Sequence, residues 1–483
     1  MASVKGNVIL YGINTLTAIL CPVITFPYAA RVLLPEGIGA VNFLNSIVGY
    51  IVLLTNLGIP MYAVREVAKY RDDKLSRDKT TLELMLLSMV LCVVGYMTVW
   101  ILAEFVPQIH RQASLFYILS LSILFNTIGV NWFYQGIEDF KFITIRAIII
   151  RTITTAALFI FVRDSSDILI YGIILVGFTV GNNLINFLHL RKYLNYNLIR
   201  LKELNVSRHI KPALQVFVLN LITNLSLHLN SIMLGFLSGD EEVGYFTAGT
   251  KITHIGLTLI SSLGIVLLPR CSNLIQNGDM AGFSSVIRKS LKVTLALSLP
   301  MIVGLSILAV PVTLIFCGNE YIPSIPVLYL NAPVILLVSL TNIMGMQVLY
   351  PMDWVNIVIA SVSIGAAVNM ILNFLIVPDY GATGAAVATL IADVTVVVTQ
   401  LIMGRKSYPF KFTDMFTPKY IFAAIMMGLA VFAWTFVPVS IVWRLTVGIL
   451  IGTTVYFGIL LIQKDALALE IISMATKKLR IKR

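Results

Sequence analysis

The sequence predicts an all-α integral membrane protein with about fourteen transmembrane helices, arranged as two six-helix lobes plus two extra helices, with both termini in the cytoplasm. The first observation behind this prediction is composition: of 483 residues, 58% are hydrophobic and only 12% are charged. A soluble chain of this length would carry about twice that share of charge. The excess apolar surface has to face lipid, which excludes a soluble enzyme, a disordered chain and a secreted disulfide scaffold.

The second observation is the number of long apolar stretches, since a helix needs roughly 20 apolar residues to cross the bilayer core. Three short turn sequences, 34–37, 238–240 and 378–381, separate closely spaced stretches. The first stretch is expected to stay in the chain as a span, because it is too long for a signal peptide and lacks a small-residue cleavage site. The predicted spans lie near residues 7–31, 38–60, 80–104, 113–134, 142–162, 168–190, 213–237, 243–268, 291–315, 324–349, 355–377, 382–403, 420–437 and 443–463.

The distribution of basic residues sets the predicted orientation. With the N-terminus in the cytoplasm, the cytoplasmic segments carry 28 of the 35 Lys and Arg residues and the outer segments carry four. Cytoplasmic loops of membrane proteins are enriched in Lys and Arg, so the net charge of +12 reflects orientation and not nucleic-acid binding. The outer connections are all shorter than ten residues. Because no soluble domain is expected on either side, the function should lie within the membrane.

The sequence contains none of the motifs that would indicate an enzyme. No nucleotide-binding loop, zinc-protease helix or nucleophile elbow is present. The four cysteines are far apart and form no metal-ligand cluster, which is typical of small buried hydrophobic residues. We therefore expect no metal and no cofactor.

The third observation is a repeat in the spacing of the spans. The second span opens at Gly37-Ile38-Gly39 and the eighth opens at Glu242-Val243-Gly244, 205 residues later. The same offset places the first span on the seventh, and the remaining spans of the first half follow with a small drift. Each half contains an even number of spans, so the repeat is parallel, with its axis along the membrane normal. The predicted divisions are an N-terminal lobe with its cytoplasmic linker (1–212), a C-terminal lobe (213–403), and two further helices with a basic tail (404–483).

Polar residues recur along one face of spans 1, 2, 7 and 8, which are equivalent in the two halves. A polar stripe cannot face lipid, so it faces other helices or a wet cavity. Matching stripes on equivalent helices favour a substrate cavity between the halves, and hydrogen bonding within a dry bundle is the alternative. The polar candidates for substrate binding are Asn14, Asn42, Asn45, Asn220, Asn224 and His254.

Basic residues inside the spans predict an anionic substrate. Lys251 is roughly 12 Å along span 8 and belongs to its polar stripe, so it either faces the substrate or has a structural role. Arg151 is roughly 13 Å along span 5, with the same two alternatives. Arg146 lies near the inner end of span 5 and is expected to extend to the cytoplasmic surface. Arg31, at the end of span 1, completes the cationic candidates.

One acidic residue, Asp393, lies near the middle of span 12. It shares a face with Thr389, and Asn369 and Asn373 share a face of span 11. Carboxylate and amide oxygens are ligands for a cation, and a membrane carboxylate can also carry a proton. These four residues are therefore candidates for coupling to H⁺ or Na⁺. A buried hydrogen-bond network is the alternative interpretation.

Several short strings in the sequence are typical of one known family, and the strings 131–140 and 58–66 are the most specific. They are Pro35-Glu36-Gly37-Ile38-Gly39, Gly58-Ile59-Pro60 with Arg65-Glu66, Asn131-Trp132-Phe133-Tyr134-Gln135-Gly136, Met233-Leu234-Gly235, and Pro378-Asp379-Tyr380-Gly381. On these strings the chain resembles the polysaccharide branch of the multidrug/oligosaccharidyl-lipid/polysaccharide exporter superfamily, and within it the O-antigen-type flippases (Wzx or RfbX). The resemblance covers nearly the whole chain.

The resemblance implies fourteen helices around a central cationic cavity. It also implies ion-driven translocation of undecaprenyl-pyrophosphate-linked oligosaccharide from the cytoplasmic to the periplasmic leaflet of the bacterial inner membrane, within lipopolysaccharide biosynthesis. The expected partners are this lipid-linked oligosaccharide, membrane lipids, a polysaccharide polymerase and a chain-length regulator. Two positions depart from the family pattern: Leu34 stands where glycine is usual, and Asn230 where aspartate is frequent.

Two other functions remain as alternatives. A drug or cation antiporter of the same superfamily predicts a cavity dominated by acidic and aromatic residues, whereas the basic residues within these spans outnumber the one central acid. A membrane-embedded polysaccharide polymerase or ligase needs a sizeable outer loop to hold catalytic residues. The short outer connections disfavour that class of enzyme.

Overall fold

The structure is a computed structural model that describes residues 4–194, 203–405, 407–409 and 417–470, with the side chains of 4–11, 13–16, 19, 218–227, 259 and 261–266 left out of the description. Across these described ranges the regular elements are all helical. The chain forms two compact units, Met1–Gly244 and Tyr245–Arg483.

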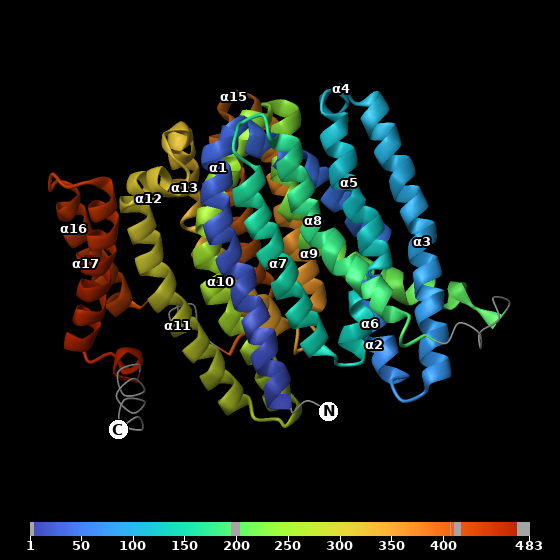
Figure 1. The fold of residues 1–483 in the computed structure, drawn as a ribbon. Coiled ribbons are helices and arrows are strands. Elements are labelled where there is room, and N and C mark those ends of the chain that lie inside the picture. The colour runs from blue at the N-terminus through green and yellow to red at the C-terminus, as the bar shows by residue number, and fades with distance from the viewer. Residues whose placement is uncertain (1–3, 195–202, 406, 410–416, 471–483) are drawn as a thin grey trace, which may run out of the picture. The chain divides into compact units, whose positions relative to one another are not determined.

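The first unit is built from long apolar helices with short connections (Figure 1). Two aspartates start helices here: Asp73 accepts from the backbone of Leu75 and Ser76, and Asp139 accepts from Phe142. Helix α1 packs against α5, α7 and α9, and α5 packs against α8. The helices are α1 (Val4–Asn56), α2 (Ile59–Lys69), α3 (Lys74–Phe105), α4 (Pro107–His110), α5 (Ala113–Ile128), α6 (Asn131–Gly136), α7 (Phe140–Phe161), α8 (Ile168–Leu190), α9 (Ile210–Leu237) and the first turn of α10 (Asp240–Gln276).

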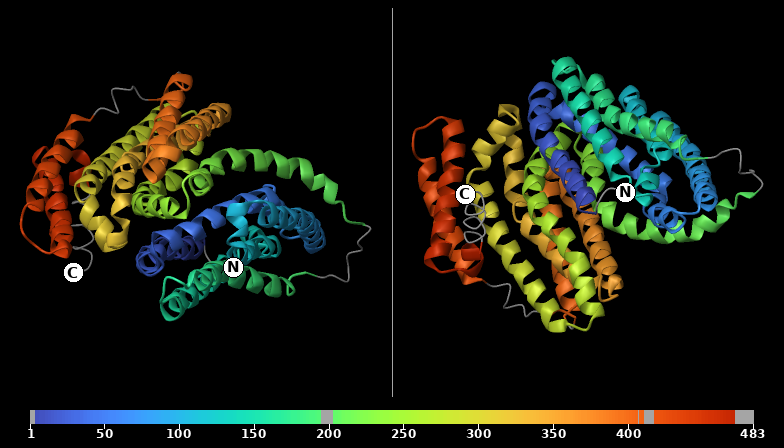
Figure 2. Two further views of the ribbon diagram at one scale, coloured as in Figure 1. Left: turned by 90° about the horizontal axis from the view of Figure 1, so that it is seen from above. Right: turned by 60° about the horizontal axis from the view of Figure 1, so that its bottom comes forward.

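The second unit contains the rest of α10 and the helices that follow it. Helices α16 and α17 pack against each other, and α16 also packs against α11 (Figure 2). A π-helical segment, Ile343–Leu349, continues α14. The helices are α11 (Met280–Ile307), α12 (Ala309–Phe316), α13 (Ile325–Asn331), α14 (Val334–Asn342), α15 (Val355–Met403), α16 (Pro418–Thr435) and α17 (Ile441–Ile462).

The predicted all-α, multi-pass fold is confirmed. Within the described residues, nine helices are long and apolar enough to cross a membrane, or ten if the bent pair 319–331 and 334–349 is one span. Most predicted spans coincide with a helix or with part of one, and the long helices α1 and α15 each hold two of them. The predicted spans 113–134, 291–315 and 324–349 are each divided between consecutive shorter helices. Helix α1 is interrupted at Leu34 and α15 at Gly381. The count of fourteen, the orientation and the predicted divisions at residues 212 and 403 stay predictions.

Leu34 adopts a backbone conformation that favours glycine. Its φ is 61° and its ψ is 175°, a region that residues with a Cβ rarely occupy. The break lets the chain reverse between the two spans held in α1. The side chain is 40% exposed, so it contributes little packing to offset this strain.

Replacing Leu34 by glycine should therefore raise stability. Relief of the strained conformation is worth about 1–3 kcal/mol, and thermal unfolding of the purified protein in detergent measures the gain. Leu54→Gly is the matched control, because Leu54 is also an exposed leucine of α1 (52%) but has helical geometry. That control should lose about 1 kcal/mol. Equal destabilisation of both variants would show that Leu34 is not strained.

Two glycines related by the 205-residue offset lie at the start of spans 2 and 8. A Cβ on Gly39 would overlap the backbone of Asp240, and a Cβ on Gly244 would overlap the backbone of Pro35. Adding 205 to the residue numbers converts Pro35 to Asp240 and Gly39 to Gly244. The two contacts are therefore equivalent under the repeat. Such a pairing, in which i meets j and j meets i, is the signature of a two-fold relation. Glycine at both positions allows the two backbones to approach closely.

The turn between α9 and α10 offers a test of the predicted orientation. Glu241 is exposed in the first turn of α10, and the predicted topology puts it on the periplasmic side. With the four native cysteines replaced, Glu241→Cys should react with a membrane-impermeant maleimide in intact cells, whereas Lys74→Cys should react only after the membrane is opened. Labelling of Glu241→Cys only in opened cells would reverse the orientation.

Candidate functional site

The polar stripe of α10 divides into a buried part and an exposed part within the second unit. Thr247 is buried, and Thr250 donates to the carbonyl of Phe246 at 2.7 Å. Lys251 and His254, four residues further along the same face of α10, are exposed. Within the described part of the chain, the ammonium of Lys251 forms no hydrogen bond or ion pair. It is therefore available to an anionic ligand.

Arg151 lies beside the polar face of the first span. Its Nη1 donates to Oγ1 of Thr17 at 2.6 Å, and its guanidinium carbon is 5.2 Å from the ring centroid of Phe178. Thr17 lies one turn from Asn14 on the predicted stripe of span 1. The structure thus joins a cation of α7 to the polar face of α1 within the first unit.

The other predicted site residues of the first unit lie in different environments. Arg31 is exposed on α1. Asn42 is half-buried and donates to the carbonyl of Ile38 at 2.8 Å, and Asn45 is also half-buried. The side chains of Asn14, Asn220 and Asn224 lie outside the described residues.

The polar face of span 2 packs against α9. The rings of Tyr50 and His228 are 5.6 Å apart, and a Cβ on Gly49 would lie 2.9 Å from Nε2 of His228. This part of the stripe therefore makes helix–helix contacts inside the first unit, as the alternative interpretation expects. The exposed face of α10 in the second unit has a different environment.

The coupling candidates lie in the two antiparallel halves of α15. Gln400 donates to Ser361 at 3.2 Å, and a Cβ on Gly365 would touch Val396. These contacts set the register, which puts Asp393 and Asn369 at about the same depth. Asp393 is half-buried, and no hydrogen bond joins it to Asn369 within the described residues.

The amides of span 11 pair with each other. Nδ2 of Asn373 donates to Oδ1 of Asn369 at 3.0 Å, and both residues are buried. Thr389 donates to the carbonyl of Ala385 at 2.8 Å. The structure therefore contains a hydrogen-bonded amide pair near the level of Asp393, and a role in coupling stays a prediction.

The expectation that Arg146 extends to the cytoplasmic surface is wrong. The residue is only 7% exposed. Its Nε donates to Oδ1 of Asn182 at 3.0 Å, and its Nη2 donates to Oδ1 of Asn131 at 3.2 Å. The amide oxygens of α6 and α8 take the place of water around the guanidinium, so the side chain stays inside the unit.

A buried ionic network of the first unit was not predicted. Glu83 is fully buried in α3. Its Oε2 accepts from Arg208 and is 2.8 Å from Nε2 of His209, and its Oε1 accepts from the backbone of Asn205 at 2.7 Å. The network attaches the segment before α9 to α3. The sequence did contain a signal for this network. Glu83 is an acid near the start of a predicted apolar span, and basic residues follow in a later loop.

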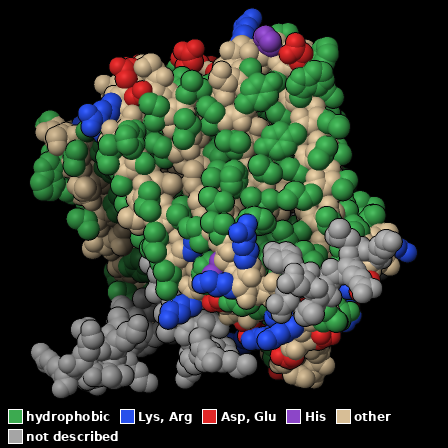
Figure 3. Space-filling model, turned by 45° about the vertical axis from the view of Figure 1, so that its right-hand side comes forward, with side chains coloured by type: hydrophobic (Ala, Val, Ile, Leu, Met, Phe, Trp, Pro, Cys, Tyr) green, Lys and Arg blue, Asp and Glu red, His purple; other side chains and the backbone are tan. Residues whose placement is uncertain are grey.

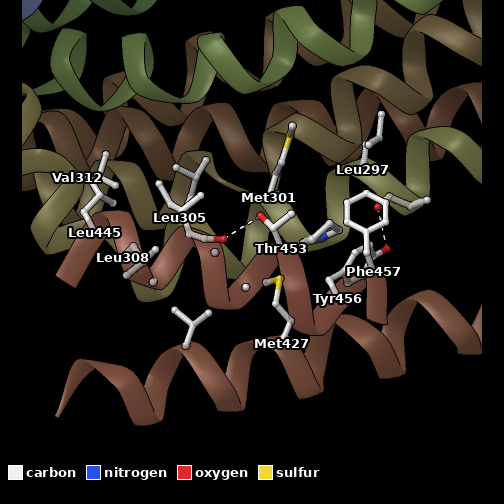
Figure 4. Close-up of a pocket in the computed structure, with 17 residues that line it drawn as sticks. Leu297, Met301, Leu305, Leu308, Val312, Met427, Leu445, Thr453, Tyr456 and Phe457 are labelled. Atoms are coloured by element: carbon white, nitrogen blue, oxygen red, sulfur yellow. Dashed lines mark hydrogen bonds between the residues drawn. The ribbon is translucent and has the colours of Figure 1, made fainter. Parts of the chain in front are cut away.

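The second unit also holds an apolar groove of about 350 Å³ between α11, α16 and α17 (Figure 4). Leu297, Met301 and Met427 line it. Its hydroxyl groups are already used, because Thr453 donates to Ile449 and Tyr456 donates to Ala296, both at 2.8 Å. The groove thus presents hydrocarbon rather than hydrogen-bonding groups.

The molecular surface carries a broad hydrophobic band (Figure 3). On the face shown, several Lys and Arg side chains gather near the lower edge of this band, with acidic side chains beside them, and acidic and basic side chains both lie along its upper edge. An apolar band flanked by charged groups is the surface that a bilayer requires.

Comparison with known sequences gives consistent matches. Residues 3–275 match the polysaccharide biosynthesis protein family. A candidate O-antigen transporter of Escherichia coli (strain K12) is 28% identical over 412 residues, which cover 83% of this chain and 96% of the relative. The lipid II flippase MurJ of Bacillus subtilis (strain 168) is 25% identical over 186 residues, which cover 38% of this chain and 34% of that protein.

Comparison with solved structures identifies the fold. The inward closed conformation of the lipid II flippase MurJ has a TM-score of 0.76 at 17% identity, covering 95% of this chain and all (100%) of that one. An inward-facing multidrug transporter of the MATE family has a TM-score of 0.64 at 16% identity, covering 83% of this chain and 97% of the other. At these identities the likeness concerns the fold alone.

Proposed function

Since this chain belongs to the polysaccharide biosynthesis protein family, we propose that it moves undecaprenyl-pyrophosphate-linked oligosaccharide units from the cytoplasmic to the periplasmic leaflet of the bacterial inner membrane. The coarser function, a membrane flippase of the exporter superfamily and not an enzyme, follows from the family and its relatives. The substrate, the direction and the ion coupling are the parts that we propose.

The physical task is to carry a charged, hydroxyl-rich headgroup through hydrocarbon. Moving an unpaired charge into an apolar medium costs many kcal/mol, so the headgroup needs a path lined by polar and cationic groups. Its prenyl tail needs no such path, because hydrocarbon can stay in hydrocarbon. A protein for this substrate therefore has to offer both kinds of surface within the membrane.

The observation that carries the proposal is the exposed cationic face of α10. Lys251 and His254 lie on one side of a helix that the sequence places in the membrane, and neither is buried in the core of its unit. An ammonium at this depth needs an anion or water as its partner. The pyrophosphate of a lipid-linked sugar supplies that anion, and hydroxyl and amide groups of the stripes would contact the sugars.

The apolar groove of the second unit is suited to the prenyl tail of the substrate. Its lining by Leu297, Met301 and Met427, with internally paired hydroxyl groups, offers a surface for a hydrocarbon chain. We propose that part of the prenyl tail lies there during transport. This placement keeps the tail in an apolar environment while the headgroup follows the polar path.

Deletion of the gene tests the proposed substrate in cells. A strain that lacks the gene should accumulate lipid-linked oligosaccharide in the inner leaflet and lose its surface polysaccharide, and expression of the chain should restore it. A polymerase and a chain-length regulator are the proposed downstream partners. Unchanged surface polysaccharide in the deletion strain would refute the substrate assignment, and loss of drug resistance instead would favour an antiporter.

Coupling to an ion gradient gives a separate prediction for Asp393. Asp393→Asn should leave substrate binding largely intact but slow turnover about tenfold or more, since it removes a group that carries a proton or holds a cation. Transport into vesicles with and without an imposed H⁺ or Na⁺ gradient measures this. Asp353→Asn, in a connection outside the spans, is the control. If Asp393→Asn responds to the gradient as the parent does, Asp393 is a packing residue.

A further inference from the structure

A pocket of about 490 Å³ opens on the first unit between the start of α7 and the end of α8. It is separate from the polar stripes used in the proposed function. Its lining combines two cations, Lys141 and Arg146, with the imidazole of His189 and the carboxylate of Asp139. The remaining lining is aromatic or aliphatic, so the pocket joins a polar end to an apolar side.

The guanidinium of Arg146 has an incomplete set of partners. Arg146 is only 7% exposed, and the two hydrogen bonds of its guanidinium go to neutral amides. Its Nη1 has no hydrogen-bond partner within the described residues, and no described carboxylate pairs with it. An uncompensated buried charge is costly, so the pocket lacks a negative charge.

A second buried nitrogen without a partner lies beside the same pocket. Nδ1 of His189 has no hydrogen-bond partner among the described residues. The His189 ring stacks on Phe142 with centroids 4.2 Å apart, and the guanidinium carbon of Arg146 is 5.4 Å from that same phenylalanine ring. Phe142 therefore holds both nitrogen-bearing groups in place around one space.

Asp139 does not supply the missing negative charge. Its Oδ1 accepts from the backbone of Phe142 at 3.2 Å, and its Oδ2 is 3.3 Å from the hydroxyl of Tyr193. It is thus engaged in starting α7 and anchoring Tyr193. Lys141 at the rim is exposed, and it leaves the pocket with an excess of positive charge.

The side of the pocket toward the bilayer is aliphatic. Ile145 and Ile149 follow Lys141 at four-residue intervals along α7, and both are about half exposed at 46% and 51%. Arg146 lies six residues after the start of α7, or roughly 9 Å along the helix axis. Under the predicted orientation this is the cytoplasmic end of α7, where a headgroup meets its acyl chains.

From this arrangement we infer that the pocket binds the phosphate of an anionic phospholipid of the cytoplasmic leaflet, with the acyl chains along Ile145 and Ile149. Basic pockets between transmembrane helices on the cytoplasmic side bind lipid phosphates in this way. The lipid phosphate would lie near the guanidinium of Arg146 and the ammonium of Lys141. Such a lipid would join α7 to α8 and stabilise the first unit.

Native mass spectrometry of the full chain in detergent tests this inference with two lipids of equal chain length. The parent should bind one phosphatidylglycerol more tightly than phosphatidylethanolamine. Lys141→Gln should weaken phosphatidylglycerol binding about fivefold, the effect of one basic residue near a lipid surface, and leave phosphatidylethanolamine unchanged. Lys74→Gln, another exposed lysine at the predicted cytoplasmic end, should have no effect.

A steric variant tests the pocket without changing charge. Ile145→Trp should fill the space and abolish the preference for phosphatidylglycerol, whereas Ile153→Trp, exposed on the same helix but outside the pocket, should retain it. Arg146→Gln should lose the preference as well. Because that variant also removes hydrogen bonds to Asn131 and Asn182, thermal unfolding without added lipid must first show that it is folded. If Arg146→Gln is not folded, the result for Ile145→Trp alone tests the inference.

Three results would overturn the inference. The first is equal binding of the two phospholipids by the parent. The second is displacement of phosphatidylglycerol by millimolar inorganic phosphate alone, which would indicate a site for a soluble anion. The third is preferential binding of undecaprenyl phosphate at this pocket, with sensitivity to Ile145→Trp, which would make it a substrate site.

Discussion

Replacing Lys251 by alanine is expected to abolish surface polysaccharide while the protein stays in the membrane at normal abundance. The exposed ammonium on α10 is the proposed partner of the pyrophosphate. Hydrogen bonds to charged groups contribute about 1.5–3 kcal/mol, which corresponds to a loss of transport between roughly tenfold and a hundredfold. Immunoblotting of membranes and staining of extracted polysaccharide provide the two measurements.

Two further variants separate charge from position. Lys251→Arg keeps a cation on the same face of α10 and should partly restore export, although the planar guanidinium differs in shape from an ammonium. Lys292→Ala removes an exposed lysine of α11 in the same unit and should export normally. Normal export by Lys251→Ala would assign this lysine a structural role.

Replacing Glu83 by alanine is expected to cause the largest loss of stability among the variants considered for the first unit. The change leaves Arg208, His209 and the backbone N–H of Asn205 without their buried acceptor. The Arg208 side chain is 41% exposed and can be hydrated, whereas His209 is buried, so the loss is expected from the buried donors left without an acceptor, about 1–3 kcal/mol each. Thermal unfolding of the purified protein measures the loss, and proteolysis of the linker before α9 should accelerate.

The ion pair between Arg71 and Glu138 is the matched control. Its charged atoms are 3.0 Å apart, but the glutamate side chain is 57% exposed. An exposed pair contributes about 0–1 kcal/mol, so Glu138→Ala should change stability little. A loss in Glu83→Ala no greater than in Glu138→Ala would show that the buried network does not hold the linker.

The helices were predictable because a helix that crosses a membrane requires a long apolar stretch of sequence. Composition and length alone located the long apolar stretches that the structure shows as helices, but not the breaks that divide the spans 113–134, 291–315 and 324–349. They could not show that two pairs of spans would each form one interrupted helix, because that depends on backbone angles at single residues. Leu34 illustrates this, since its φ of 61° breaks α1 without a glycine.

The environments of individual side chains were less predictable. Distance from a helix end suggested that Arg146 reaches water, but the neighbours that retain it, Asn131 and Asn182, come from other helices. The partners of Glu83 are more than a hundred residues away, at separations of 125 and 126. The sequence pattern indicates how deep a residue lies in the membrane and which face of its helix it occupies. Pairings between distant residues depend in addition on which helices pack against each other.

The most direct test of the central claim is translocation by the purified protein in liposomes. Undecaprenyl-pyrophosphate-linked oligosaccharide is placed in both leaflets, and a membrane-impermeant glycosidase reports the fraction that becomes accessible from outside. The proposed function predicts that the parent protein exposes nearly all of the lipid-linked sugar, and that Lys251→Ala does so at a rate roughly tenfold to a hundredfold lower. Accessibility in parent vesicles equal to that of protein-free vesicles, under every imposed ion gradient, would contradict it.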